Sequence, residues 1–159
     1  MRVYNGLDSD GYALSAEAFG AEQVGAEVVF KLGPANAPDA VTSKTIPLPA
    51  GKFSSVKILG LAVDGKQERQ PFTVNYTDGT SSSFTQSLSD WAGGGDLPGE
   101  SVAVQMPYRV AGDGSKDANP FNACAYSFTL DSTKTVRSLT LPSNRNVVVF
   151  AVTLVPAGK

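Results

Sequence analysis

Residues 72–85 read FTVNYTDGTSSSFT. Alternate positions from Phe72 to Tyr76 are apolar, an Asp-Gly dipeptide follows at positions 78–79, and Phe84 resumes the alternation. Asp-Gly between two such runs is a strong signal for a tight β-hairpin, because both residues tolerate positive φ. A period of two residues also indicates strands with one face turned inward and the other toward solvent. The stretch therefore predicts an antiparallel hairpin in a half-buried sheet.

The same turn signal recurs along the chain. Further Asp-Gly dipeptides stand at positions 10–11, 64–65 and 113–114. Short runs rich in Val, Ile, Thr, Phe and Tyr separate the turns and are typical of strands. They predict eight strands, at residues 27–32, 54–63, 72–76, 83–88, 102–110, 121–130, 136–141 and 147–154, and weaker strands at 12–15 and 42–46.

No segment predicts a convincing helix. Residues 15–24 include helix-favouring Ala and Glu, but Gly20 and Gly25 interrupt them, so we expect a turn or a short strand there. Residues 147–152 are continuously apolar, as expected for a strand in the middle of a sheet that is covered on both faces. The pattern predicts one all-β domain over residues 1–159, an antiparallel two-sheet β-sandwich of the jelly-roll or galactose-binding-like kind.

The composition excludes several classes of function. The chain has no histidine and one cysteine, Cys124, which removes Ser-His-Asp and Cys-His catalysis, zinc sites that need imidazole or paired thiolates, and any intramolecular disulfide. The 13 basic and 15 acidic groups give a net charge of −2, so we expect no nucleic acid partner. No apolar run reaches the length of a membrane span or of an export signal, so we expect neither.

Paired carboxylates are the remaining general acid–base groups once histidine is absent. Asp90, Asp96 and Glu100 lie around one loop, but sequence spacing does not bring two carboxyl groups to the separation that glycoside hydrolysis needs. We therefore expect the chain not to be an enzyme, with a hydrolase built on Asp and Glu as the least favoured alternative.

Asp8 and Asp10 stand at alternate positions before Gly11, as in the first half of a calcium-binding loop. The bidentate Glu that would complete such a loop is missing at the required distance. A polar turn is the first interpretation, and a structural Ca²⁺ held by Asp8 and Asp10 is the alternative.

Candidate ligand-binding residues cluster in the second half of the chain. Trp91 opens a glycine-rich loop at the end of a strand, where we expect its ring to be half-exposed. An exposed ring stacks on the apolar face of a pyranose, while Arg, Asp and Asn side chains bridge sugar hydroxyls. We therefore expect a shallow glycan site formed by Trp91, Tyr108, Arg109, Asp117 and Asn119.

Each of these residues also has a structural interpretation. For Trp91, packing at the edge of a core is the first interpretation, and ligand contact is the alternative. Arg109 pairs equally well with Asp117 or Asp113 as a clasp across the long polar loop 110–120. Cys124 lies in a strand of small residues, where a lone thiol is usually a buried apolar filler.

Several segments together resemble the accessory galactose-binding-like β-sandwich domains, similar to carbohydrate-binding modules, of secreted bacterial glycoside hydrolases and peptidases. The resemblance covers nearly the whole chain and rests on residues 6–16, 30–41, 46–51, 72–80, 87–91, 106–109, 126–128 and 138–142. It departs from the family where Asn122 and Cys124 replace an aromatic-rich segment, and where a first strand before Gly6 is missing.

The resemblance implies a non-catalytic carbohydrate-binding module of a secreted enzyme. Its expected partners are a polysaccharide or glycan and a neighbouring catalytic domain, and its expected location is extracellular. The loss of aromatic residues at Asn122 and Cys124 removes stacking surface and favours an alternative. In that alternative, the chain is a structural or protein-interaction β-sandwich without a sugar ligand, which would present an exposed hydrophobic patch.

Overall fold

The structure is a computed structural model that describes residues 7–14, 22–25, 28–31 and 40–158. All of the regular elements in these ranges are strands: β1 (Glu22–Gly25), β2 (Val28–Lys31), β3 (Thr45–Gly51), β4 (Phe53–Ala62), β5 (Gln67–Tyr76), β6 (Ser81–Leu88), β7 (Ser101–Met106), β8 (Arg109–Val110), β9 (Lys116–Asp117), β10 (Phe121–Thr129), β11 (Val136–Thr140) and β12 (Val147–Pro156). The predicted all-β class is confirmed. No helix in this part of the chain is long and apolar enough to cross a membrane.

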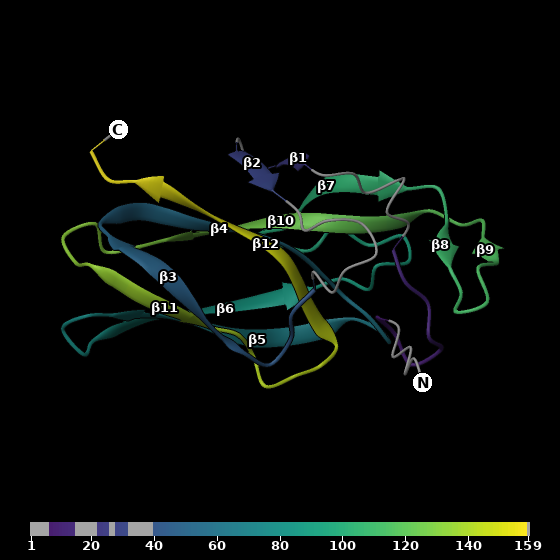
Figure 1. The fold of residues 1–159 in the computed structure, drawn as a ribbon, viewed down its shortest axis with the longest axis horizontal. Helices are drawn as coiled ribbons and strands as arrows, with labels where there is room; N and C mark the ends of the chain where they lie inside the picture. Colours follow the sequence, from purple (N-terminus) through teal and green to yellow (C-terminus); the bar gives the residue numbers. More distant parts are fainter. Residues whose placement is uncertain (1–6, 15–21, 26–27, 32–39, 159) are drawn as a thin grey trace.

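Two four-stranded antiparallel sheets face one another (Figure 1). One sheet has the strand order β12-β4-β10-β7, and the other has the order β3-β11-β5-β6. The β1–β2 hairpin lies on the outer side of the first sheet, and the short β8–β9 hairpin lies at one end of the molecule (Figure 1). The predicted two-sheet sandwich is therefore confirmed.

The predicted hairpin of residues 72–85 is confirmed as the β5–β6 pair, with Phe72 opposite Phe84 and Gly79 at a φ of 86°. The Asp-Gly dipeptide at 113–114 likewise joins β8 to β9. The dipeptide at 64–65 also forms a tight turn, but it leads from β4 in one sheet to β5 in the other. Asp-Gly specifies a sharp reversal and does not specify which sheet receives the next strand.

Most predicted strands are present, with changes at their ends. The predicted strand 102–110 is two strands, β7 and β8, because the chain breaks pairing around Pro107. Of the predicted strand 12–15, residues 12–14 contribute one backbone bridge, between Ala13 and Val110, and residue 15 lies outside the described residues. Of the stretch 15–24, residues 22–24 belong to β1, and the remainder lies outside the described residues, as do residues 27 and 32 of the first predicted strand.

The prediction that residues 147–152 lie in the middle of a sheet is wrong. β12 is the outer strand of its sheet, and a bridge with Val41 is the backbone contact on its other side. The continuous apolar run is explained by burial on both faces: Val147 and Val149 pack between the sheets, whereas Val148 and Phe150 pack on the outer face. Burial of both faces does not require a central position.

The first sheet has a hydrophobic core on each of its faces. The inner core, between the two sheets, includes Ile58, Phe72 and Tyr126. The outer core is formed by the opposite face of the β12-β4-β10-β7 sheet with Trp91, Phe30 of β2 and partly buried Leu7, Tyr12 and Leu14. The segment 7–14 and the β1–β2 hairpin therefore form a third layer on this sheet.

β3 is an edge strand that carries proline at alternate positions. The N–H of Leu141 donates to the carbonyl oxygen of Lys44, 2.8 Å away, so backbone groups of even-numbered residues here point toward β11. Backbone groups alternate sides along a strand, and Pro47 therefore lacks an N–H donor on the open side of β3, while Pro49 lacks one in the irregular stretch between the partners of Ser138 and Val136. Removing these donors protects an edge from pairing with another chain.

Candidate functional site

The structure corrects the expectation for Trp91. Its side chain is not half-exposed: the residue is 2% exposed and belongs to the outer core, with its ring 4.9 Å from the ring of Phe121. Backbone hydrogen bonds with Ala62 and Asn122 fix the residue at both its N–H and its carbonyl oxygen. The indole offers no free face for stacking on a sugar, because hydrophobic neighbours already cover it.

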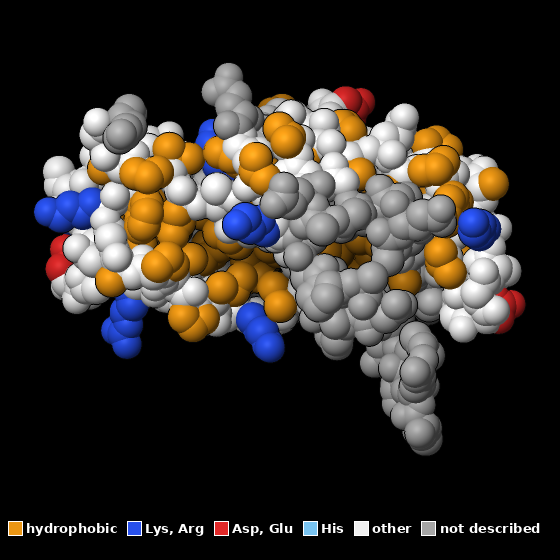
Figure 2. Space-filling view, turned by 45° about the horizontal axis from the view of Figure 1, so that its top comes forward, with side chains coloured by type: hydrophobic (Ala, Val, Ile, Leu, Met, Phe, Trp, Pro, Cys, Tyr) orange, Lys and Arg blue, Asp and Glu red, His pale blue; other side chains and the backbone are white. Residues whose placement is uncertain are grey.

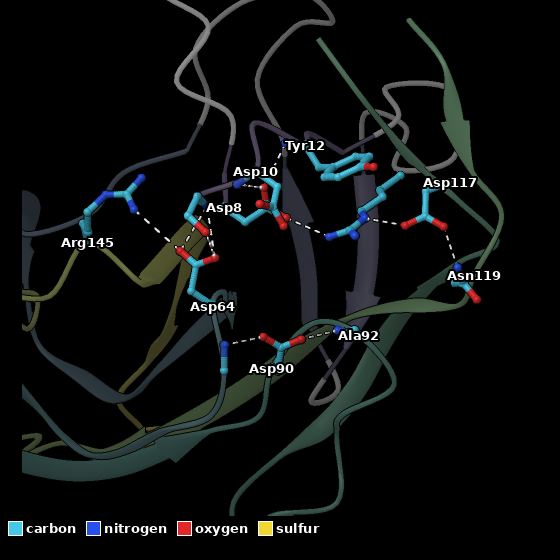
Figure 3. Close-up of polar contacts among 12 residues, drawn as sticks. Asp8, Asp10, Tyr12, Asp64, Asp90, Ala92, Asp117, Asn119 and Arg145 are labelled. Carbon is cyan, nitrogen blue, oxygen red and sulfur yellow. Dashed lines mark hydrogen bonds and ion pairs between the residues drawn. The ribbon is translucent and has the colours of Figure 1, made fainter. Parts of the chain in front are cut away.

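Arg109 lies at the centre of the predicted residues and binds two carboxylates. Its Nη1 donates to Asp8 and its Nε donates to Asp117, each over 2.8 Å (Figure 3). The guanidinium carbon lies 3.7 Å from the ring centroid of Tyr12 and 4.7 Å from that of Phe121. We call Arg109, Asp8, Asp117 and Tyr12 the arginine clasp.

The arginine clasp is largely closed to solvent. The side chain of Arg109 is 19% exposed, and that of Asp8 is 3% exposed. The hydrogen bond from Arg109 lowers the pKa of Asp117, and a hydrogen bond from Asn119 adds to this effect. The expected Arg109–Asp117 pairing is therefore present, whereas Asp113 instead accepts hydrogen bonds from Ser115.

Tyr108 and Asn119 lie at the margin of the arginine clasp. Tyr108 is half-buried, and the Lys116 ammonium lies 4.3 Å from its ring centroid. Asn119 is exposed and donates to Asp117 (Figure 3). The structure thus brings together Trp91, Arg109, Asp117 and Asn119, but the hydrogen-bonding groups of Arg109 and Asp117 face one another.

Both carboxylate oxygens of Asp8 already have hydrogen-bond partners. Asp8 Oδ1 accepts the backbone N–H groups of Asp10 and Tyr12, at 3.2 and 2.9 Å, and its Oδ2 binds Arg109. Asp10 is exposed, and the described residues contain no group of three or more carboxylate, thiolate or imidazole side chains that could hold a metal. These contacts describe a polar turn in which Asp8 is paired with a guanidinium cation, and the structural Ca²⁺ stays a prediction.

The carboxylates of Asp64 and Asp90 also hold backbone groups together in this region. The carboxylate of Asp64 accepts the N–H and the hydroxyl of Ser9, and the N–H contact lowers the pKa of Asp64 (Figure 3). Asp90 accepts the N–H groups of Gly65 and Ala92. The contact of Asp90 with Ala92 is local, but Ser9 is 55 residues from Asp64 and Gly65 is 25 residues from Asp90, so no local pattern identifies these two contacts.

Glu100 holds the loop that follows Trp91. Its Oε1 accepts the N–H of Ser89 and the hydroxyl of Tyr126, at 2.6 and 2.8 Å. Nearby Cys124 is buried, and burial raises the pKa of its thiol to about 12, so the thiol stays protonated near neutral pH. A buried, protonated thiol agrees with the expected structural role of Cys124. Glu100 holds the loop after Trp91 in place through Ser89 and Tyr126.

A second feature is an apolar groove on the side of the sandwich where β3 and β12 are the outer strands. It has a volume of about 550 Å³, and its lining residues come from β2, β3, β4 and β12: Val29, Lys31, Ile46, Pro47, Leu48, Pro49, Phe53, Val152, Thr153 and Leu154. Figure 2 shows hydrophobic side chains around this hollow. Ile46, Leu48 and Leu154 also pack against the inner core, so the groove is the open margin of that core.

The apolar surface extends from the groove over the β1–β2 hairpin. Val29, which lines the groove, is 47% exposed, and its cross-strand partner Val24 is 66% exposed. Directly opposite residues of an antiparallel pair lie on the same face. The alternation of proline with Ile46 and Leu48 is the sequence signal that could have identified this edge.

Comparison with known families gives a match over almost the entire chain. Residues 2–157 match the model of the AziU2-like beta-sandwich domain. No curated protein matches the chain. The match supports the β-sandwich that the sequence resemblance implied, and it gives no support to a galactose-binding-like or carbohydrate-binding identity. The chain belongs to the family of AziU2-like beta-sandwich domains.

Proposed function

We propose that this β-sandwich is a non-catalytic interaction domain that binds a segment of another polypeptide in the apolar groove between β3 and β12. The observation that carries the proposal is the exposed apolar lining of that groove and its continuation over Val24 and Val29. Apolar surface that is contiguous and left open to solvent is typical of protein-binding sites.

The geometry of the groove also restricts how a partner binds. Pro47 lacks an N–H donor toward the open side of β3, and Pro49 lacks one in the irregular stretch that follows, so a partner strand cannot form a regular ladder there. Binding therefore depends on apolar side chains that enter the groove, and extended peptides are the simplest ligands to test.

A glycan site at the arginine clasp is the weaker candidate. Trp91 is buried, and the carboxylates of Asp8 and Asp117 are paired with Arg109. Of the predicted ligand-binding residues outside the Arg109 ion pairs and the core, Tyr108 is half-buried and Asn119 is exposed. Two side chains of this kind without the indole make a small platform for a sugar ring.

The test is a selection of peptides from a random display library on the full chain, followed by affinity measurements on two matched variants. Val29→Asn changes the groove, and Val102→Asn changes a valine of nearly equal exposure, 46%, outside the groove lining. We expect Val29→Asn to weaken peptide binding about tenfold, which is about 1.4 kcal/mol, and Val102→Asn to leave it unchanged.

Thermal unfolding of both variants checks that each remains folded. Failure to select any peptide, or equal affinity of both variants, overturns the proposal. Binding to polysaccharides in affinity gels that Tyr108→Ala abolishes and Val29→Asn does not would favour the glycan site instead.

A further inference from the structure

The charged residues in the groove lining and at the two ends of β3 are lysines. Lys31 lines the groove and is the one charged residue in its lining. Lys44 immediately precedes β3, and Lys52 immediately follows it. The strand on the opposite side, β12, contains no charged residue.

Acidic residues are missing from the stretch of sequence that contains β3 and β4. Between Asp39 and Asp64 the chain has three lysines and no Asp or Glu. Figure 2 agrees with this distribution: Lys and Arg side chains border the hollow, and the visible Asp and Glu side chains lie at the periphery of the view. Glu22 stands opposite Lys31 in the β1–β2 ladder. The positive charge that a partner would meet is therefore assigned to Lys44 and Lys52, at the two ends of β3.

The lysines at the ends of β3 are available for a partner. The ion pairs formed between described residues use Lys66, Lys134, Arg109 and Arg145 as their cations, and none uses Lys31, Lys44 or Lys52. The groove thus combines an apolar floor with unpaired positive charge at its margin. Complementary charge at the margin of an interface steers association and selects among partners.

We propose that the occupant of the groove is an extended polypeptide segment in which apolar residues are flanked by Asp or Glu. This inference rests on the proposed function and specifies the chemistry of its partner. The apolar residues enter the groove over Leu48, Val152 and Leu154, and the acidic flanks pair with Lys44 and Lys52 at the two ends of β3. Prolines at positions 47 and 49 leave side-chain contacts, and not strand addition, as the basis of recognition.

The test uses synthetic peptides with one alternating Val/Leu core and three kinds of ends. One peptide has Asp pairs at both ends, one has Lys pairs, and one has Ser pairs. We expect the acidic peptide to bind the full chain about tenfold more tightly than the Ser peptide at low salt, and the Lys peptide to bind more weakly still. High salt should reduce the advantage of the acidic peptide, because the charges at the margin are solvent-exposed.

Two double variants with reversed charges test whether Lys44 and Lys52 cause the preference for acidic ends. The double variant Lys44→Glu/Lys52→Glu should remove the preference for acidic ends, whereas Lys66→Glu/Lys116→Glu, with the same net charge change away from the ends of β3, should preserve it. Thermal unfolding of both double variants checks the fold.

The outcomes separate this inference from the proposed function. Equal binding of all three peptides, with the Val29→Asn effect retained, overturns the acidic partner and leaves the groove as a peptide site. Absence of binding by any peptide overturns both. Self-association of the chain in sedimentation experiments that Val29→Asn abolishes would instead assign the groove to a second copy of this chain.

Discussion

At the scale of single residues, Arg109 joins parts of the chain that are far apart in sequence. It follows β7, its partner Asp117 lies in β9, and its partner Asp8 lies in the N-terminal segment. The guanidinium also covers the rings of Tyr12 and Phe121, so its contribution includes cation–π contact as well as charge pairing. A single planar cation with fixed donors suits this position better than an ammonium group.

We predict that Arg109→Gln lowers the free energy of unfolding by about 2–3 kcal/mol, because the nearly buried carboxylate of Asp8 loses its cation. Arg145→Gln is the matched control: its pair with Asp64 spans 3.7 Å and its side chain is 56% exposed, so the loss should stay below about 1 kcal/mol. Urea unfolding at neutral pH measures both. Equal losses in the two variants would contradict the structural role of the arginine clasp.

At the scale of elements, the edges of the two sheets are protected in different ways. β12 is bridged by Val41, and Thr153 donates to the carbonyl oxygen of Val29 in β2. β3 has no such cover on its open side among the described elements and relies on Pro47 and Pro49. The sheet edge beside the groove is therefore blocked for backbone pairing while its side chains stay accessible.

We predict that Pro47→Val promotes self-association, since it restores an N–H donor on the open side of an edge strand and adds a β-branched residue. Ala50→Val is the control, because it adds a similar side chain to the same strand without adding a donor. Light scattering after size-exclusion chromatography over a range of protein concentrations would detect the difference. Identical behaviour of the two variants would mean that the missing donor does not protect the edge.

At the scale of the whole molecule, carboxylates attach the N-terminal layer to the sandwich. Asp64 holds Ser9, and Asp117 holds Arg109, which in turn holds Asp8. The pKa values of Asp64 and Asp117 are both lowered from 3.8 by these contacts. A carboxylate with a lowered pKa in the folded state contributes stability above its unfolded pKa, and that contribution is lost as the pH falls toward the folded value.

We predict that the free energy of unfolding changes little between about pH 5 and pH 8 and falls below about pH 4, because the chain has no histidine to titrate in the neutral range. The double variant Asp64→Asn/Asp117→Asn should be less stable at neutral pH and should show a shallower acid dependence. Asp96→Asn, which changes an exposed carboxyl outside both contacts, is the control. Urea unfolding across this pH range measures the effect, and a steep loss between pH 5 and pH 7 would contradict it.

The site was predictable in part. The Arg109–Asp117 pair is eight residues apart across one hairpin, and loop chemistry indicated it. The partner Asp8 is 101 residues from Arg109, and no local pattern connects the two. The prediction that Trp91 is half-exposed was wrong. Its position at a strand end does not show that the N-terminal segment covers that face of the sheet.

The sequence by itself determined the all-β class, the β5–β6 hairpin and most of the strands, because alternation of side chains and turn chemistry are local properties of the chain. Tertiary structure alone decided the edge position of β12, the burial of Trp91, the pairing of Arg109 with Asp8 and the groove between β3 and β12. These features depend on which strands become neighbours and on what covers each sheet face. Both are set by contacts between segments that lie far apart along the chain.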